Sequence, residues 1–179
     1  MEISDDALIQ EIRGGKSDSF AEIVERYKTQ IYNLMYRYSG SAEDAADMSQ
    51  DVFCRAFERL GQYRNQKSFF AWLYTLALNY ARDWARKRNT REHTIATFAR
   101  ESADNQTKPP ESLFEADQEV KGLVAALAML AEDRREIVLL KYRHERSIKE
   151  IAEIFGISES AVKMRLYRAL DELGQKLKN

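Results

Sequence analysis

The sequence predicts an all-α protein with two helical domains joined by a flexible linker, the second domain containing a helix-turn-helix. Seven glycines and two prolines are spread over 179 residues, and strong helix formers such as Ala, Leu, Glu, Lys and Arg are abundant. The stretch 90–111 has no apolar period, is acidic in its later part and contains Pro109-Pro110, which is typical of a linker. We therefore divide the chain into an N-terminal domain (1–91), a linker (92–112) and a C-terminal domain (113–179).

The N-terminal domain is expected to contain a short leading helix and three longer helices, over about residues 17–38, 42–60 and 67–89. Ser41 followed by Asp44 is a capping signal that comes directly after Gly40, so one helix should end and the next begin there. Residues 61–66 are polar and should form the loop before the third long helix.

The expected helix 42–60 has one apolar and one polar side. A polar helix side is usually only solvated, and an acidic edge does not favour DNA, so a function here requires a large partner. Cys54 lies on the polar side, where a small half-buried residue is a better interpretation than a reactive thiol. The apolar side consists of Ala45, Met48, Val52, Phe53, Ala56 and Leu60, and the polar side of Asp47, Gln50, Asp51, Cys54 and Glu58.

The expected helix 67–89 combines an aromatic face with a polar, basic one. Arginine can hold phosphates, an Asn side chain can pair with a base edge, and an aromatic beside a positive groove can stack on an unpaired base. The alternative is that these aromatics are simply core. The expected core face is Phe69, Leu73, Leu76, Ala77, Tyr80 and Trp84, and the expected outer face is Thr75, Asn79, Arg82 and Arg86 with Trp72 at its edge. The positive charge of the outer face is extended by Lys87, Arg88 and Arg91. The loop before the helix could hold a flipped base and contains Tyr63, Arg64, Asn65, Gln66 and Lys67.

The C-terminal domain should hold four helices, of which the last two form the helix-turn-helix. Ser147 with Glu150 is a capping box, Gly156 is suited to end the first helix, and Ser158 is a natural N-cap for the second. On the first helix, Ile148, Ile151, Ala152 and Phe155 share one face.

The second helix of this pair has an outward face suited to DNA. A helix-turn-helix places such a helix in the major groove with polar and basic side chains outward. The alternative is a plain helical hairpin with a solvated basic face. The expected inner face is Val162, Leu166, Ala169, Leu170 and Leu173, and the outer face is Ser160, Met164, Tyr167 and Arg168, flanked by Lys163 and Arg165.

Bulk properties exclude several classes of protein. The net charge of −1 gives no global basic field, so DNA contact must come from local patches or from a partner that supplies affinity. A single cysteine excludes an internal disulfide and fits a reducing, cytoplasmic location. The first ten residues are not expected to be a signal peptide, and the apolar stretch 123–131 is too short to span a membrane.

No catalytic residue, cofactor or metal is expected. The chain has no phosphate-cradling glycine loop, no paired His/Cys spacing and no nucleophile elbow. His93, in or near the linker, and His144, at a helix end beside basic residues, are expected to be solvated. We therefore do not expect an enzyme.

Four stretches together resemble the extracytoplasmic-function group of bacterial RNA polymerase sigma factors, in the sigma-70 family. They read DSFAEIV at 18–24, EDAADMSQDVF at 43–53, FAWLYTLALN at 70–79, and IKEIA at 148–152 with VKMRLYRA at 162–169. Their order and spacing cover nearly the whole chain apart from the linker. The resemblance implies a sigma factor that binds core RNA polymerase, recognises the −10 and −35 promoter elements and promotes DNA melting.

The resemblance also implies roles for individual residues. It implies contact with the clamp helices of the largest polymerase subunit through Asp47, Gln50, Asp51, Phe53 and Arg55. It implies −10 DNA binding by Tyr63, Arg64, Asn65, Lys67, Ser68, Trp72, Thr75, Asn79, Arg82 and Arg86, with the loop 61–68 capturing a flipped base. It implies −35 DNA binding by Ser158, Glu159, Ser160, Lys163, Met164, Arg165, Tyr167 and Arg168. Its further implied partners are the flap of the second-largest subunit and an anti-sigma factor.

Three positions depart from the family pattern. Thr75 stands where Arg is frequent, which removes a phosphate contact near −10. Glu159-Ser160-Ala161 replaces a Val-Gly-Thr-type turn, and Glu159 could repel phosphate or accept from a cytosine amine. Ala131 stands where Pro often opens a helix. The alternative function is an ordinary helix-turn-helix activator or repressor, which would bind its operator tightly without polymerase, usually as a dimer.

Overall fold

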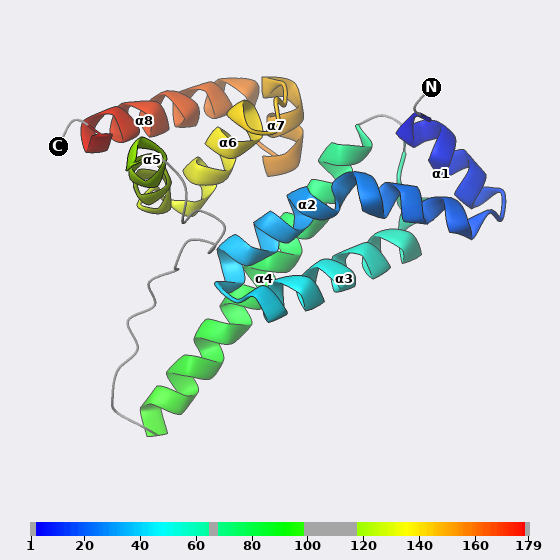
Figure 1. Ribbon diagram of the computed structural model, residues 1–179, viewed down its shortest axis with the longest axis horizontal. Helices are drawn as coiled ribbons and strands as arrows, with labels where there is room; N and C mark the ends of the chain where they lie inside the picture. The colour runs from blue at the N-terminus through cyan, green and yellow to red at the C-terminus, as the bar shows by residue number, and fades with distance from the viewer. Residues whose placement is uncertain (1–2, 65–67, 99–117, 178–179) are drawn as a thin grey trace. The chain divides into compact units, whose positions relative to one another are not determined.

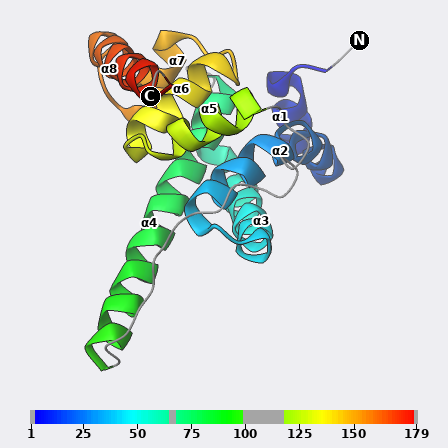
Figure 2. The same cartoon turned by 60° about the vertical axis from the view of Figure 1, so that its left-hand side comes forward.

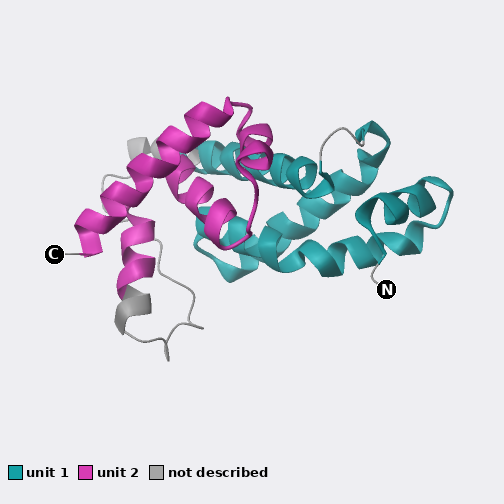
Figure 3. Cartoon of the chain, turned by 90° about the horizontal axis from the view of Figure 1, so that it is seen from above, with its two compact units in different colours: residues 1–106 teal, residues 107–179 magenta. Residues whose placement is uncertain are grey.

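The computed structural model describes residues 3–64, 68–98 and 118–177. Within these ranges all regular secondary structure is helical, which confirms the predicted all-α class (Figure 1). The chain divides into two compact units, residues 1–106 and 107–179, coloured teal and magenta in Figure 3. The division falls inside the stretch expected to be a linker.

The first unit is built from α2, α3 and α4, with α1 packed at one end of α2. Helices α2 and α3 lie side by side, and α4 packs across both before its second half continues away from them (Figure 2). The elements are α1 (Asp5–Arg13), the 3-10 turn η1 (Ser17–Ser19), α2 (Phe20–Ser39), α3 (Ala42–Glu58), the 3-10 turn η2 (Leu60–Gln62) and α4 (Phe69–Phe98).

The predicted boundary between α2 and α3 is confirmed. Gly40 adopts the left-handed conformation with φ of 68° and its N–H donates to the carbonyl of Tyr36, which ends α2. The Ser41 hydroxyl then accepts from the N–H of Asp44 at 3.2 Å and begins α3. These short-range bonds allow the chain to reverse within two residues.

Helix α4 departs from its prediction in length. It continues to Phe98, beyond the expected end at Asn89 and into the stretch expected to be a linker. No glycine or proline occurs between Arg86 and Phe98, so nothing in the local sequence stops the helix. The rest of the expected linker, residues 99–112, lies outside the described residues.

The core of the first unit lies between these three long helices. Every residue expected on the apolar side of the helix 42–60 is buried, although α3 ends at Glu58 and Leu60 lies in η2. On α4 the prediction is partly wrong, because Leu76, Tyr80 and Trp84 are only half-buried. Since α4 packs on both α2 and α3, its buried face includes residues beside the single row of apolar residues that the sequence pattern indicates. The buried residues of α4 are Phe69, Phe70, Ala71, Leu73, Tyr74, Ala77, Leu78 and Ala81.

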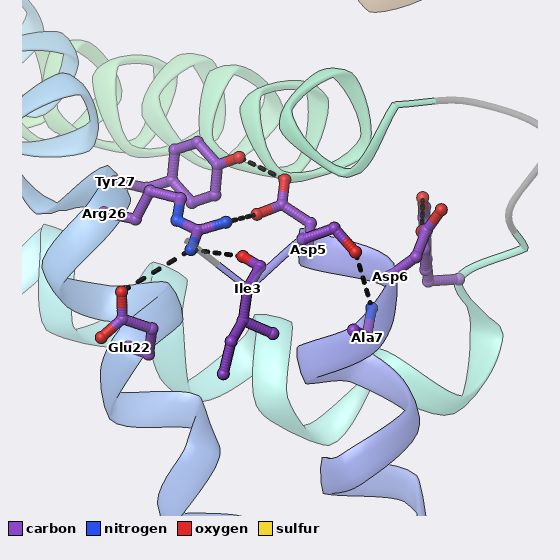
Figure 4. A network of polar contacts seen from close by, with 9 residues as sticks. Ile3, Asp5, Asp6, Ala7, Glu22, Arg26 and Tyr27 are labelled. Carbon is purple, nitrogen blue, oxygen red and sulfur yellow. Dashed lines mark hydrogen bonds and ion pairs between the residues drawn. The ribbon is translucent and has the colours of Figure 1, made fainter. Parts of the chain in front are cut away.

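A polar network fixes α1 on α2. Arg26 of α2 forms an ion pair with Asp5 and donates to the Ile3 carbonyl at 2.8 Å, while Glu22 lies 3.6 Å from the same guanidinium (Figure 4). The Tyr27 hydroxyl donates to the second carboxylate oxygen of Asp5. Because Asp5 is at the N-terminus of α1 its charge also suits the helix dipole, so the short helix is held at its first turn.

The second unit contains the four expected helices. Its core joins α5, α6 and α8 through Ala126, Leu130, Val138, Ala169 and Leu173. The elements are α5 (Gln118–Ala128), α6 (Glu132–Tyr142), α7 (Ile148–Phe155) and α8 (Glu159–Leu177).

Two predictions of the inner faces in this unit need correction. Leu170, expected in the core, is 40% exposed, because the part of α8 that joins the core cluster is formed by Ala169 and Leu173. On α7, Ile151 and Ala152 are buried as expected, but Ile148 and Phe155 are half-buried and Ile154 is buried instead. The short α7 packs on both α6 and α8, so its buried face is wider than one row.

No helix among the described residues carries an apolar stretch of the length needed to cross a bilayer.

Candidate nucleic-acid and protein interfaces

Helices α7 and α8 form the predicted helix-turn-helix. The Ser147 hydroxyl accepts from the N–H of Glu150 at 3.1 Å, and the Glu150 carboxylate accepts from the N–H of Ser147 at 3.0 Å, which completes the capping box. Gly156 ends α7 with φ of 63°. The Ser158 hydroxyl caps α8 by accepting from the N–H of Ala161 at 3.2 Å. These local bonds end α7 and begin α8 within a short turn, and one face of α8 remains exposed.

The outward face of α8 carries most of the residues predicted to contact −35 DNA. Tyr167 is 74% and Met164 is 57% exposed, and the cationic residues Lys163 and Arg168 are also exposed. This face therefore presents cations, an aromatic ring and a flexible apolar side chain together, which suits contact with phosphates and base edges. Ser158, Glu159 and Ser160 are also exposed at the helix start.

Arg165 differs from its neighbours on α8. Its guanidinium lies 3.4 Å from the carboxylate of Asp133 on α6, and its side chain is 39% exposed. An ion pair at this distance and exposure is weak. The pair nevertheless joins α8 to α6, a contact that the sequence pattern did not indicate.

In the first unit, the polar side of α3 is exposed as predicted. Asp47, Gln50, Asp51 and Arg55 all lie on it. Phe53 does not, because it is only 7% exposed and belongs to the core. Of the residues predicted to bind polymerase, Phe53 is therefore buried, and it lines an apolar groove between α2 and α3 together with Gln50.

Tyr80 of α4 connects to this surface. Its hydroxyl donates to the Asp51 carboxylate at 2.7 Å, and the Arg55 guanidinium lies 4.6 Å from the centre of its ring. Burial raises the pKa of Tyr80 to about 12, with the Asp51 hydrogen bond and charge acting in the same direction. Tyr80 was predicted to be core, and no pattern in the sequence indicates this contact between α3 and α4.

An apolar groove of about 790 Å³ lies between α2 and α3, beside Gln50. Its lining includes the edge-to-face pair Phe20 and Phe57, with ring centres 5.1 Å apart. Cys54 lies at this groove and is exposed, so the prediction that it is half-buried is wrong. The turn of α3 that places Val52 and Phe53 in the core leaves the next residue outside.

The predicted −10 face of α4 is partly exposed. Asn79 and Arg86 are exposed, whereas Thr75 and Arg82 are half-buried. The Thr75 hydroxyl donates to the Ala71 carbonyl of its own helix at 2.7 Å, as Thr in helices often does. Asn79 is therefore the residue on this face best placed to reach a base edge.

Two further cationic positions on α4 differ in their surroundings. Arg86 forms an exposed ion pair with Asp83 one turn away, which leaves it accessible to a phosphate. Arg88, expected to extend the positive charge, instead donates to the Ser39 carbonyl at 2.9 Å and lies 5.4 Å from the Trp84 ring centre. A cation at the C-terminus of α2 complements the helix dipole, so Arg88 has a structural contact.

The segment before α4 is held by aromatic packing. Tyr63 is 3% exposed, and its ring lies against Phe69 and Trp72 with centre distances of 5.4 and 5.6 Å. Burial raises the pKa of Tyr63 to about 12, and the nearby Asp6 carboxylate adds to the shift. Tyr63 is therefore buried, and its predicted contact with −10 DNA stays a prediction. Ser68 caps α4 by accepting from the N–H of Ala71 at 3.1 Å.

Arg64 is exposed. Asn65, Gln66 and Lys67 lie outside the described residues, so their predicted role stays a prediction.

Taken together, the described residues form a helical protein with two units, of which the second contains a helix-turn-helix, a motif that commonly binds DNA. One unit exposes the second helix of a helix-turn-helix; the other exposes an acidic, polar helix side beside a helix with Asn and Arg outward. No group of acidic, His or Cys side chains within the described ranges has the geometry of a metal site.

Comparisons with known proteins identify the family. Residues 23–91 match the family model for Sigma-70 region 2, and residues 121–173 match that for Sigma-70, region 4. The chain is 29% identical over 188 residues to ECF RNA polymerase sigma factor SigW of Bacillus subtilis, with 100% of each chain covered. It is 25% identical over 183 residues to ECF RNA polymerase sigma-E factor of Escherichia coli K12, covering 98% of this chain and 95% of the relative.

Solved structures share the fold. The structure of CnrH in complex with the cytosolic domain of CnrY superposes with a TM-score of 0.68 at 24% identity, covering 96% of this chain and 95% of the other. The sigma factor RpoE of Bartonella quintana, in complex with the anti-sigma factor NepR, gives a TM-score of 0.69 at 23% identity, covering 89% and 96%. The two Sigma-70 models together cover most of the chain, which therefore belongs to the sigma-70 family of RNA polymerase sigma factors; the two curated relatives named above are ECF sigma factors.

Proposed function

We propose that this sigma factor binds core RNA polymerase through the exposed side of α3, reads the −35 element with α8 and engages the −10 element with α4. The observation that carries the proposal is the combination, in one chain of net charge −1, of two separate units with different outward faces. Such a chain would bind duplex DNA weakly alone. A specificity subunit does not need strong binding of its own, because the polymerase supplies the remaining affinity.

The −35 contact is assigned to Lys163, Met164, Tyr167 and Arg168, supported by their exposure on α8. Ser158, Glu159 and Ser160 lie at the N-terminal end of the same helix, where a helix-turn-helix commonly contacts base edges. Arg165 is placed at the margin of this surface by its contact with Asp133. Its pair is weak enough for a phosphate to compete for the guanidinium.

The polymerase contact is assigned to Asp47, Gln50, Asp51 and Arg55. An acidic, polar helix side is a poor DNA surface and a good docking surface for a basic partner. The −10 contact is assigned to Trp72, Asn79, Arg82 and Arg86, with Arg64 at the start of the loop. In this arrangement the polymerase surface and the −10 surface lie on neighbouring helices of the first unit, α3 and α4.

Other partners and properties follow from membership of the group. We propose the flap of the second-largest polymerase subunit as a partner of the second unit, and an anti-sigma factor as a regulator that would cover one or both units. A cytoplasmic location is part of the same proposal, because a sigma factor acts where the polymerase and the promoter DNA are. The proposal includes no enzymatic activity and no cofactor, because promoter recognition needs neither.

Reconstitution tests the proposed function. The purified chain is mixed with bacterial core RNA polymerase, and transcription is run from a pool of genomic promoter fragments. Defined starts that require the chain are expected and would reveal both promoter elements. Failure to bind core polymerase, together with tight binding of an operator by the chain alone, would instead indicate an ordinary helix-turn-helix activator or repressor.

A further inference from the structure

Helix α1 holds residues 60–63, the segment that precedes α4 and its predicted −10 face. The Arg13 guanidinium, at the last turn of α1, donates to the carbonyl of Leu60 at 2.9 Å and to the carbonyl of Tyr63. These carbonyls lie at the beginning of η2 and directly after it. The planar guanidinium carries several donors in a fixed fork, so one side chain can fix two points of a backbone turn.

A second contact from α1 reaches the side chain of the same residue. The Tyr63 hydroxyl donates to the Asp6 carboxylate at 3.4 Å. Both the backbone and the ring tip of Tyr63 are thus held from α1. Helix α1 can serve as a fixed support because Asp5 ties its first turn to Arg26 and Tyr27 of α2 (Figure 4).

Tyr63 in turn packs against Phe69 and Trp72 of α4, the helix that carries the proposed −10 contact. Its ring packs edge-on against Phe69 at 89° and lies 5.6 Å from Trp72, whose ring is 5.5 Å from Phe69. Phe69 and Tyr63 are buried, while Trp72 is half-buried. Trp72 is therefore the member of this cluster that a DNA base can reach, and the other two set its position.

We propose that Arg13 is a positioning residue for promoter melting: by fixing Leu60 and Tyr63 it holds the ring of Trp72 ready for an unpaired base of the −10 element. This inference rests on the proposed function of α4. Extruding a base costs unstacking and unpairing energy, and a receiving surface that is already ordered avoids an additional entropic cost. Loss of Arg13 should therefore slow melting more than it weakens binding.

The test compares Arg13→Ala with a matched control, Lys16→Ala. Lys16 carries the same charge just after α1, is 72% exposed at its side chain and pairs with Glu11 at 3.6 Å. Each variant is bound to core polymerase, and opening of a promoter found by the reconstitution is followed with 2-aminopurine in the −10 segment. A second fragment carries a mismatched, already opened −10 segment.

We expect Arg13→Ala to open the duplex fragment on the order of tenfold more slowly than Lys16→Ala, which corresponds to about 1.4 kcal/mol. On the opened fragment the two variants should initiate transcription equally. Arg13→Lys keeps the charge without the fork, should fold normally, and should fall between wild type and Arg13→Ala on the duplex.

Two results would overturn the inference. Equal opening rates for Arg13→Ala and Lys16→Ala on the duplex would show that Arg13 does not position the surface. An equal loss on the opened fragment would show a general defect in folding or core binding. Failure of the wild-type chain on both fragments would be a different result, because it would overturn the proposed function and with it this inference.

Discussion

The change Asp51→Lys should separate the binding role of the α3 surface from its structural role. Asp51 is exposed on α3, and its carboxylate accepts from the Tyr80 hydroxyl at 2.7 Å. Arg55, one turn further along α3, lies over the Tyr80 ring. A lysine at position 51 reverses the charge proposed to face the polymerase and also removes this internal hydrogen bond.

The two effects differ in size. Losing the hydrogen bond should lower the free energy of unfolding by about 1 kcal/mol, and repulsion between the new lysine and Arg55 should add less than about 1 kcal/mol because both side chains are exposed. By contrast, truncating one partner of a charge pair that docking buries costs about 2–5 kcal/mol. The affinity for core polymerase should therefore fall by roughly thirtyfold or more.

The control is Tyr80→Phe, which removes the same hydrogen bond and leaves the Asp51 charge in place. It should cost about 1 kcal/mol of stability and leave the affinity for core unchanged. Affinity is measured by competition against labelled wild-type chain on core polymerase, and stability by urea denaturation. The reasoning fails if Asp51→Lys binds core like wild type, or if Tyr80→Phe loses as much affinity as Asp51→Lys.

Three other changes test the remaining parts of the structure. Ile151→Ala should lower the free energy of unfolding of the second unit by about 2–5 kcal/mol, because the side chain is fully buried; a cost near zero in urea denaturation would contradict the packing of α7. Lys163→Ala should reduce the slope of log affinity for −35 DNA against log salt by about one, and an unchanged slope would exclude a phosphate contact. The raised pKa of Tyr63, about 12 against an ordinary 10.0, means that the folded chain holds the phenol proton more tightly. Its contribution to stability is complete below pH 10 and lost as the pH rises toward 12. Unfolding free energies measured over this range should therefore decline less in Tyr63→Phe than in wild type, and identical declines would refute this.

Features that depend on residues within one or two helical turns were predicted well. The capping box at Ser147, the left-handed Gly156 and the Gly40-Ser41 boundary are all present. The apolar side of α3 is buried as expected. Each of these rests on hydrogen bonds or periodicity between near neighbours, which the order of residues encodes directly.

The predictions that failed concern which side of a helix meets which neighbour. Tyr80 was expected in the core but is only half-buried, and its hydroxyl donates to Asp51 of α3. Tyr63 was expected in a loop that could hold a flipped base, and its ring is buried against Phe69 and Trp72. Leu170 was expected to be buried and is exposed. The spacing of apolar residues predicts which side of a helix faces the core. The helices that pack against that side decide how wide the buried face is and which residues lie at its centre.

By itself, the sequence determined the helical class, the helix-turn-helix with its outward basic face, and the family to which the chain belongs. These follow from local propensities, capping residues and motif order. Only the tertiary structure showed that Arg13 reaches the carbonyls of Leu60 and Tyr63, 47 and 50 residues away, or that Arg165 pairs with Asp133. Such contacts depend on how separate helices pack, because that packing brings together side chains whose distance along the chain carries no information about their distance in space.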